Sequence, residues 1–151
     1  LKLLVPSLDV TLLDSLNKRL AWLDEVSTIL ALQGIRTEHA RAEERAGDPD
    51  WRERFDLVTS RAVADLRMLC ELCLPYVKVG GQMLAMKSAQ SAEEISGAGR
   101  AVSILGGRLL PAYDYTIPGT DVTHRVVRIE KIAPTPQAYP RRFAQIKKKP
   151  L

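Results

Sequence analysis

The chain has 151 residues, of which 46% are hydrophobic and 26% are charged, and its formal net charge at pH 7 is +4. This length is sufficient for one domain with a buried core. Neither a run of about eighteen apolar residues nor a basic-then-apolar secretory signal occurs, so we expect a cytoplasmic protein without a membrane span.

The first part of the chain predicts a strand, a helix and a second strand. An apolar, β-branched run at residues 10–13 ends in Asp14, and Ser15 can cap a following helix through its hydroxyl. The apolar stripe of that helix consists of Leu16, Leu20, Leu23 and Leu30, with Val26 and Ile29 beside it. Gly34 is placed to stop the helix, and residues 35–40 form a weaker strand candidate.

The middle of the chain predicts a second strand–helix–strand unit. Residues 55–60 form a β-rich run, after which the apolar residues follow helical spacing: Val63, Leu66, Cys70 and Cys73. Pro75 ends the helix, Gly80 and Gly81 supply a turn, and residues 83–86 form a short buried strand. Two strands joined through a helix are expected to be parallel.

The last third predicts one helix and an antiparallel strand pair. Ser91 and Glu94 have the spacing of a capping box, which opens a helix that reaches about Leu105. Residues 109–117 and 122–132 are two strands joined by a short loop. Strands that alternate with helices and close with an antiparallel pair indicate a three-layer α/β fold.

The cysteines and histidines give no sign of a catalytic or metal site. Cys70 and Cys73 form a C-x-x-C pair, which invites a redox or zinc interpretation. Both lie on the apolar face of the predicted helix and no second cysteine pair exists, so we interpret them as reduced core residues. Neither His39 nor His124 pairs with a serine or cysteine in a nucleophile motif.

The positive charge is concentrated at the C-terminus. Five basic residues occur there with no acidic residue among them: Arg141, Arg142, Lys147, Lys148 and Lys149. We therefore divide the chain into a domain of residues 1–138 and a basic tail of residues 139–151. Such a tail suits a polyphosphate partner, and a solvated terminus that keeps the protein soluble is an equally supported alternative.

Candidate ligand-binding residues follow each of the first three predicted strands. Asp14 follows the first, Ala42 and Glu43 follow the second, and Arg61 follows the third. In open parallel sheets, ligands bind beyond the carboxyl ends of strands, where an acid can accept the hydroxyls of a ribose. Each residue alone is more often a solvated surface group, but together they favour a nucleotide-like ligand whose own chemistry performs any reaction.

Several segments together resemble one known family. They are VTLLDSLNKR at 10–19, Ala42–Glu43, FDLVTSRA at 55–62, YPRR at 139–142 and KKP at 148–150. The chain resembles the bacterial small-subunit rRNA methyltransferase G family, also called glucose-inhibited division protein B, from its first residue to nearly its last. The resemblance implies a class I, Rossmann-like methyltransferase that uses S-adenosyl-L-methionine to methylate guanine N7 in the decoding-region loop of 16S rRNA.

The same resemblance implies roles for individual residues. Asp14 would contact the ribose of the cofactor, Ala42 and Glu43 would lie at its adenine, and Arg61 would line the site near the methyl group. Our own inference adds the basic tail as the contact with rRNA phosphates: Arg141, Arg142, Lys147, Lys148 and Lys149. No catalytic residue is predicted, because guanine N7 carries a free lone pair and the reaction then depends on alignment. No metal ligand is predicted either, because the sequence has no metal-ligand spacing.

The chain departs from the family in one respect. The family's glycine-rich cofactor loop, its first strand and an amino-terminal helical region would all precede Leu1. Without that strand, we expect a gap in the sheet between the strand that ends in Asp14 and the strand that ends in Ser60. The small ribosomal subunit is the expected partner of the family, and we expect a monomer.

Two other functions remain open at this point. One is a non-catalytic RNA-binding module on a degenerate methyltransferase fold, which would bind RNA but not the cofactor. The other is a nicotinamide-dependent oxidoreductase, since Asp14 also suits that cofactor. The basic tail and the closing antiparallel pair argue against the oxidoreductase.

Overall fold

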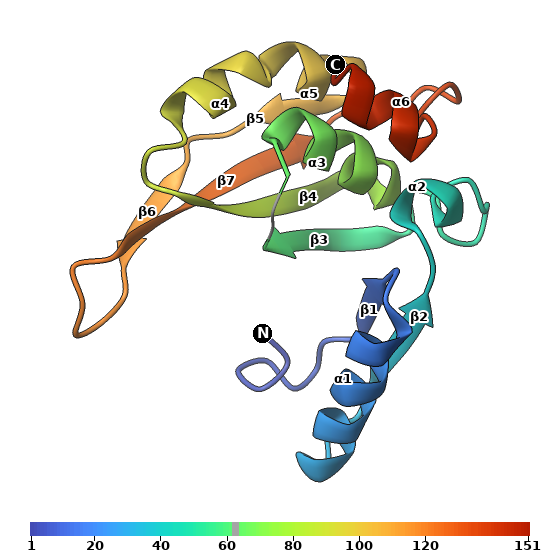
Figure 1. The fold of residues 1–151 in the computed structure, drawn as a ribbon, viewed down its shortest axis with the longest axis vertical. Helices are drawn as coiled ribbons and strands as arrows, with labels where there is room; N and C mark the ends of the chain where they lie inside the picture. The colour runs from blue at the N-terminus through green and yellow to red at the C-terminus, as the bar shows by residue number, and fades with distance from the viewer. Residues whose placement is uncertain (62–63) are drawn as a thin grey trace. The chain divides into compact units, whose positions relative to one another are not determined.

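The computed structural model describes residues 1–61 and 64–151 of the chain (Figure 1). These residues form two compact units, residues 1–45 and residues 46–151, which are described one at a time. Val63, predicted as the first residue of a helical apolar face, lies outside the described residues.

The first unit is a parallel strand–helix–strand arrangement. Its elements are β1 (Val10–Asp14), α1 (Asn17–Ile29), β2 (Ile35–His39) and the short α2 (Ala42–Arg45). The two strands pair in parallel, with Val10 opposite Ile35 and Asp14 opposite His39. The predicted order of strand, helix and strand is confirmed.

The predicted Ser15 cap is wrong. Leu16 precedes α1 and caps it without a side-chain hydrogen bond. The amide of Leu16 instead donates to Asp14 Oδ1 over 2.8 Å, so the carboxylate at the end of β1 turns the chain into the helix.

The first unit buries little apolar surface of its own. Among residues 1–45, all of which are described, only Leu20 is buried. Trp22 is 62% exposed and Ile29 is 73% exposed, although both lie on α1. The apolar residues predicted to form a stripe on this helix are therefore only partly covered by other residues of the first unit.

The second unit contains a mixed sheet. Its strands are β3 (Phe55–Arg61), β4 (Val77–Ser88), β5 (Gly107–Leu109), β6 (Tyr113–Thr116) and β7 (Thr123–Lys131). Their order is β3-β4-β7-β5, with β6 also paired to β7. β3 and β4 are parallel, as predicted, and β7 is antiparallel to β4, β5 and β6. Among the described residues, β1 pairs only with β2, and β3 pairs only with β4.

The turn predicted at Gly80 and Gly81 is wrong, because both glycines lie inside β4. Gly80 has a φ of 87°, a conformation that side chains disfavour. A Cβ atom on Gly81 would lie 2.7 Å from the carbonyl oxygen of Asp56. The register with β3 shifts between Phe55 and Leu57, so the glycines accommodate an irregularity in a longer strand instead of a turn.

Two predicted elements of the last third are each divided in the structure. The helix expected from Ser91 to Leu105 consists of α4 (Ala92–Gly97) and α5 (Gly99–Ile104). The strand expected at 109–117 consists of β5 and β6, and Pro111 between them lacks the amide hydrogen needed for a sheet bond. The predicted antiparallel pairing with the last strand is confirmed.

Helices cover one face of the second sheet. α3 (Leu66–Cys73) packs there with α4 and α5, and Figure 1 shows these helices on the same side of β4 and β7. The buried core consists of Leu66, Leu69, Cys70, Leu74, Val77, Met83, Ala85, Ala98, Val102, Leu105, Val127 and Ile129. No helix in the described part of the chain is long and apolar enough to cross a membrane.

The basic C-terminal segment is folded in part. It contains α6 (Phe143–Lys148), in which Ile146 is completely buried. Tyr139 and Leu151 pack against the core of the second unit. A division between residues 1–138 and a tail of residues 139–151 stays a prediction.

Candidate functional site

The first unit places three of the predicted site residues at the carboxyl ends of its two parallel strands. Asp14 ends β1 in register with His39, and the amide of Ala40 donates to the carbonyl oxygen of Asp14 over 3.2 Å. Ala42 then begins α2, and Glu43 follows it. These residues therefore follow the carboxyl ends of two parallel strands, as the sequence predicted.

The carboxylate of Asp14 has acceptor positions that its local contacts leave open. Its Oδ1 accepts from the amide of Leu16 at 2.8 Å, and its Oδ2 lies 3.3 Å from a guanidinium nitrogen of Arg19. A carboxylate offers about four acceptor positions, so two remain for the hydroxyls of a sugar. The side chain is 25% exposed, which leaves it accessible to a ligand.

The carboxylate of Glu43 is more enclosed than that of Asp14. Its side chain is 9% exposed and lies 3.9 Å from the guanidinium of Arg41. The residues after these two strands thus combine an accessible carboxylate, Asp14, with a more enclosed one, Glu43, at the start of a helix.

The second unit places Arg61 at the corresponding edge of its own sheet. Arg61 is the last residue of β3, lies opposite Met86 of β4, and is exposed. Its guanidinium forms no ion pair with any residue that the structure describes. It is therefore available to an anionic ligand or to a nucleobase.

Lys87, near the end of β4, has a structural role that the sequence did not indicate. Its side chain is 9% exposed, and its ammonium donates to the carbonyl oxygen of Ala64 and to Glu94 Oε1, each over 2.6 Å. The same carboxylate oxygen accepts from the amide of Leu66. Glu94 was predicted to cap its own helix, but it fixes the beginning of α3 close to Arg61 instead.

Both histidines make structural contacts. Nε2 of His39 lies 3.2 Å from the carbonyl oxygen of Ser15. The ring of His124 lies 5.8 Å from the ring of Tyr115 on the neighbouring strand. Neither residue is joined to a serine or cysteine nucleophile in the described part of the chain.

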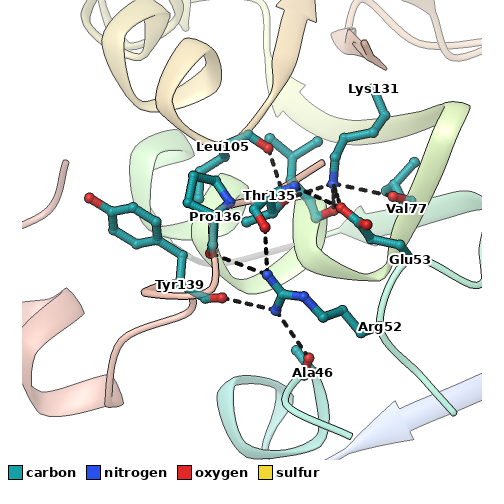
Figure 2. Close-up of polar contacts among 10 residues, drawn as sticks. Ala46, Arg52, Glu53, Val77, Leu105, Lys131, Thr135, Pro136 and Tyr139 are labelled. Atoms are coloured by element: carbon teal, nitrogen blue, oxygen red, sulfur yellow. Dashed lines mark hydrogen bonds and ion pairs between the residues drawn. The ribbon is translucent and has the colours of Figure 1, made fainter. Parts of the chain in front are cut away.

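A buried polar cluster occupies the opposite edge of the second sheet (Figure 2). Lys131, the last residue of β7, is completely buried, and its ammonium lies 3.0 Å from Glu53 Oε1. It donates to Thr135 Oγ1 over 2.6 Å and to the carbonyl oxygens of Leu74 and Val77 over 2.7 and 3.2 Å. Burial lowers the pKa of Lys131, and the Glu53 carboxylate opposes that effect.

Arg52 extends this cluster to the chain that follows β7. Its guanidinium donates to the carbonyl oxygens of Thr135 and Tyr139 over 2.7 and 2.9 Å, and to that of Pro136 over 3.2 Å (Figure 2). Because backbone oxygens accept these bonds, Arg52 fixes the path of the main chain between β7 and α6.

Arg141 is held by a buried acid. Glu71 of α3 is completely buried and accepts three hydrogen bonds from Arg141: from the amide and Nε over 2.8 Å and from a terminal guanidinium nitrogen over 2.6 Å. Glu71 thereby raises the pKa of Arg141. The predicted RNA contact of Arg141 stays a prediction, but its guanidinium already has a structural partner.

The other four predicted RNA-binding residues are exposed: Arg142, Lys147, Lys148 and Lys149. Their distance from Arg61 follows from the sheet register. Ser88, at the same edge as Arg61, lies opposite His124 at the start of β7, whereas Lys131 ends that strand at the other edge. Seven residues of strand at about 3.3 Å each separate the two edges by roughly 23 Å.

The cysteines behave as core residues in the structure. Both are free thiols, and Cys70 is completely buried. Burial raises the pKa of Cys70 well above its ordinary value and that of Cys73 to about 12. Within the described residues, no group of three His, Cys, Asp or Glu side chains is arranged to hold a metal ion.

We therefore expect the two thiols to react slowly with iodoacetamide at pH 8, because only thiolate reacts and burial disfavours thiolate. Mass spectrometry after a short exposure should find Cys70 unmodified in the native protein and alkylated in urea. Rapid native alkylation of Cys70 would contradict its place in the core.

Comparison with known proteins identifies the family. The family described as GidB, rRNA small subunit methyltransferase G, matches residues 1–114. The protein named ribosomal RNA small subunit methyltransferase G from Clostridium tetani is 46% identical over 151 residues, which cover 100% of this chain and 63% of that protein. The protein of the same name from Clostridium perfringens is 46% identical over 143 residues, covering 95% and 60%. The chain thus spans less than two thirds of the length of these curated relatives.

Solved structures support the fold. An rRNA methylase from Streptococcus thermophilus is 12% identical, with a TM-score of 0.57 that covers 83% of this chain and 74% of that one. A putative methyltransferase from Thermoplasma acidophilum is 14% identical, with a TM-score of 0.60 over 83% and 58%. These likenesses confirm the predicted Rossmann-like methyltransferase fold. On the family match and the identity to its relatives, the chain belongs to the rRNA small subunit methyltransferase G family.

Proposed function

We propose that this chain contributes to the methylation of guanine N7 in the decoding-region loop of 16S rRNA, with S-adenosyl-L-methionine as the methyl donor. Family membership supports the reaction class. The observation that carries the proposal to these residues is the Asp14 carboxylate, which ends a parallel strand, is accessible, and has acceptor positions left for ribose hydroxyls.

The proposed roles follow the edges of the two sheets. Asp14 would accept the ribose hydroxyls, while Ala42 and Glu43 would border the adenine. Arg61 would lie near the target base, where a guanidinium can donate to the O6 edge of guanine. The bound cofactor supplies a methyl group on a positively charged sulfur, which is already activated for transfer.

The residues at these strand ends have to position the guanine and the cofactor, and none of them has to transfer a proton. Guanine N7 carries an in-plane lone pair in the neutral base, so no proton has to be removed before attack. Alignment of the nitrogen with the methyl carbon and sulfur is then the main contribution of the protein. Lys87 and Glu94 support this by fixing Ala64 and Leu66, which follow Arg61 closely in the chain.

We further propose that the partner is the small ribosomal subunit or its RNA. The protein would act in the cytoplasm and as a monomer. The family name supports an rRNA substrate. Sedimentation of the protein alone and with small subunits would test both the monomer and the partner. A stable dimer without RNA would contradict the monomer.

The deciding experiment is methyl transfer from labelled S-adenosyl-L-methionine to small-subunit RNA and to small subunits, with the protein from its complete reading frame. The RNA is digested and the labelled nucleoside is identified. Label in 7-methylguanosine is the expected result. Absence of label, together with RNA binding but no affinity for S-adenosylhomocysteine, would replace the proposal by an RNA-binding module. Affinity for a nicotinamide cofactor instead would replace it by an oxidoreductase.

Replacing Arg61 by alanine is expected to lower kcat/KM for RNA methylation about 10- to 100-fold, the effect of losing a charged hydrogen bond of about 1.5–3 kcal/mol. The fold should persist, because the Arg61 side chain is exposed and forms no ion pair with a described residue. Arg54→Ala is the matched control, since Arg54 is an exposed arginine that precedes the same strand at its other end. Equal activity of the two variants would remove Arg61 from the site.

A further inference from the structure

Four basic residues lie in α6 or directly beside it, and we call them the α6 surface: Arg142, Lys147, Lys148 and Lys149. All four are exposed. No acidic residue lies between Arg141 and Leu151 to offset their charge. Phe143, which begins α6, is 37% exposed beside them.

Buried contacts on both sides hold the α6 surface in place. Before α6, the Glu71 carboxylate binds the backbone and the side chain of Arg141, and Glu71 itself is completely buried. Within α6, Ile146 is completely buried, and its amide donates to the carbonyl oxygen of Arg142 over 3.1 Å. After α6, Leu151 packs on the core. The four cations are therefore attached to a folded element and not to a flexible tail.

The chain that leads to α6 is fixed as well. The guanidinium of Arg52 binds three carbonyl oxygens between Thr135 and Tyr139, as Figure 2 shows. Thr135 in turn donates from its hydroxyl to the carbonyl oxygen of Leu105 over 2.8 Å and accepts from Lys131. These contacts already order the chain before α6 in the free protein. Less conformational entropy is therefore lost when a ligand binds.

The position of these contacts relative to Arg61 restricts the size of the ligand. Arg61 lies at one end of the strands of the second sheet, and Lys131 lies at the other end, roughly 23 Å away at about 3.3 Å per residue. The segment that Arg52 fixes follows Lys131 and leads to α6. A single nucleotide cannot reach both ends. An RNA has to extend over several nucleotides to do so.

We propose that the α6 surface is a preorganised second RNA-binding site, so that the substrate is a folded RNA extending roughly 20 Å beyond the methylated base. This inference rests on the proposed function, which supplies RNA as the ligand. Lysines and arginine bind the phosphates without regard to sequence, and the aromatic ring of Phe143 offers a stacking surface for a base. Methylation then depends on RNA structure at a distance from the target as well as on the target itself.

The first test compares two RNAs with a triple variant, K147A with K148A and K149A. The long RNA is the folded decoding region with its flanking helices, and the short RNA is a tetranucleotide containing the target guanosine. For the long RNA, affinity at low salt should fall about tenfold or more, and the slope of log affinity against log salt should become shallower by about 0.7 to 0.9 for each lost phosphate contact. For the short RNA, affinity should not change. Unchanged binding of the long RNA, or equal losses for both RNAs, would overturn the proposal.

The second test addresses preorganisation through Glu71→Gln. This variant removes one negative charge, so electrostatics alone predicts slightly tighter RNA binding. Weakening of the contact between Glu71 and Arg141 predicts the opposite, a decrease of about threefold to tenfold, because the α6 surface becomes mobile and its side chains then have to be ordered when RNA binds. Glu93→Gln is the matched control, since Glu93 is an exposed acid on α4. Tighter or equal binding by Glu71→Gln would show that the surface is not preorganised.

Hydrogen exchange in the unaltered protein keeps the test decisive if Glu71→Gln does not fold. The amides of Ile146 and Lys149, which donate within α6, should be protected before RNA is added. Exchange at the rate of an unfolded chain would overturn the proposal.

Anionic lipid vesicles serve as the competing ligand, and a preference for vesicles over RNA would also overturn it. If the unaltered protein fails to methylate RNA but these amides and the RNA affinities behave as expected, the proposed reaction fails and the binding site stands.

Discussion

Replacement of Lys131 by methionine is expected to lower the free energy of unfolding by about 3 kcal/mol, the lower part of the range for breaking a buried ion pair. Methionine keeps an unbranched side chain as far as Cε but lacks the terminal ammonium of Lys131, which is completely buried. The carbonyl oxygens of Leu74 and Val77 would each lose a hydrogen bond, and Glu53 would lose its cation. Unfolding in urea, followed by circular dichroism, measures the effect.

The matched control is Lys78→Met, because Lys78 is 48% exposed and its partner Asp56 is 81% exposed. This variant should unfold at nearly the same urea concentration as the unaltered protein, since exposed pairs are screened by water. The double variant of Lys131→Met with Glu53→Gln should recover part of the loss by removing the unpaired carboxylate. A loss below about 1 kcal/mol for Lys131→Met would show that the cluster contributes little to stability.

The second large effect is expected at Asp14. Replacement by asparagine should weaken the binding of S-adenosylhomocysteine about 10- to 100-fold, because a charged acceptor of the ribose hydroxyls becomes neutral and hydrogen bonds to charged groups contribute about 1.5–3 kcal/mol. Asparagine retains an oxygen that accepts the amide of Leu16, so the start of α1 should be preserved. Calorimetric titration of the protein from its complete reading frame measures the affinity.

Asp24→Asn is the control for Asp14→Asn. Asp24 lies in the same unit and accepts a hydrogen bond of 3.1 Å from the hydroxyl of Thr37, but it is on α1 and not at a strand end. Its replacement should leave the affinity for S-adenosylhomocysteine unchanged. Equal weakening by both variants would mean that the effect arises from stability of the unit, and unchanged affinity in Asp14→Asn would remove Asp14 from the site.

Features that depend on neighbouring residues were predicted well from the sequence. The apolar spacing of Leu66 and Cys70 indicated α3, and the strand–helix–strand order indicated the parallel pairing of β3 and β4. Asp14 and Arg61 were placed at strand ends for the same reason. Alternation and helical spacing are local properties, so one sequence is sufficient to detect them.

Features that depend on distant partners were missed. Nothing in the sequence shows that Glu71, 70 positions from Arg141, is buried and accepts hydrogen bonds from it, whereas the RNA contact of Arg141 stays a prediction. Lys131 ends an alternating strand, and its burial depends on carbonyl oxygens more than 50 positions away. The alternation of Val127, Ile129 and Lys131 on one face of β7 was the available signal, but a lysine in that pattern ordinarily indicates the end of the buried part.

The free edges of β1 and β3 have a consequence for handling the chain in isolation. Within the described residues, β1 pairs only with β2 and β3 only with β4, and a strand with one partner has backbone amide and carbonyl groups on its other side that can bind an extended segment of a second molecule. Exposed apolar residues accompany these edges, including Leu57 on β3 at 40% exposure. Concentrated solutions of the isolated chain should therefore accumulate β-rich aggregates, and dilution or a peptide that occupies an edge should slow them.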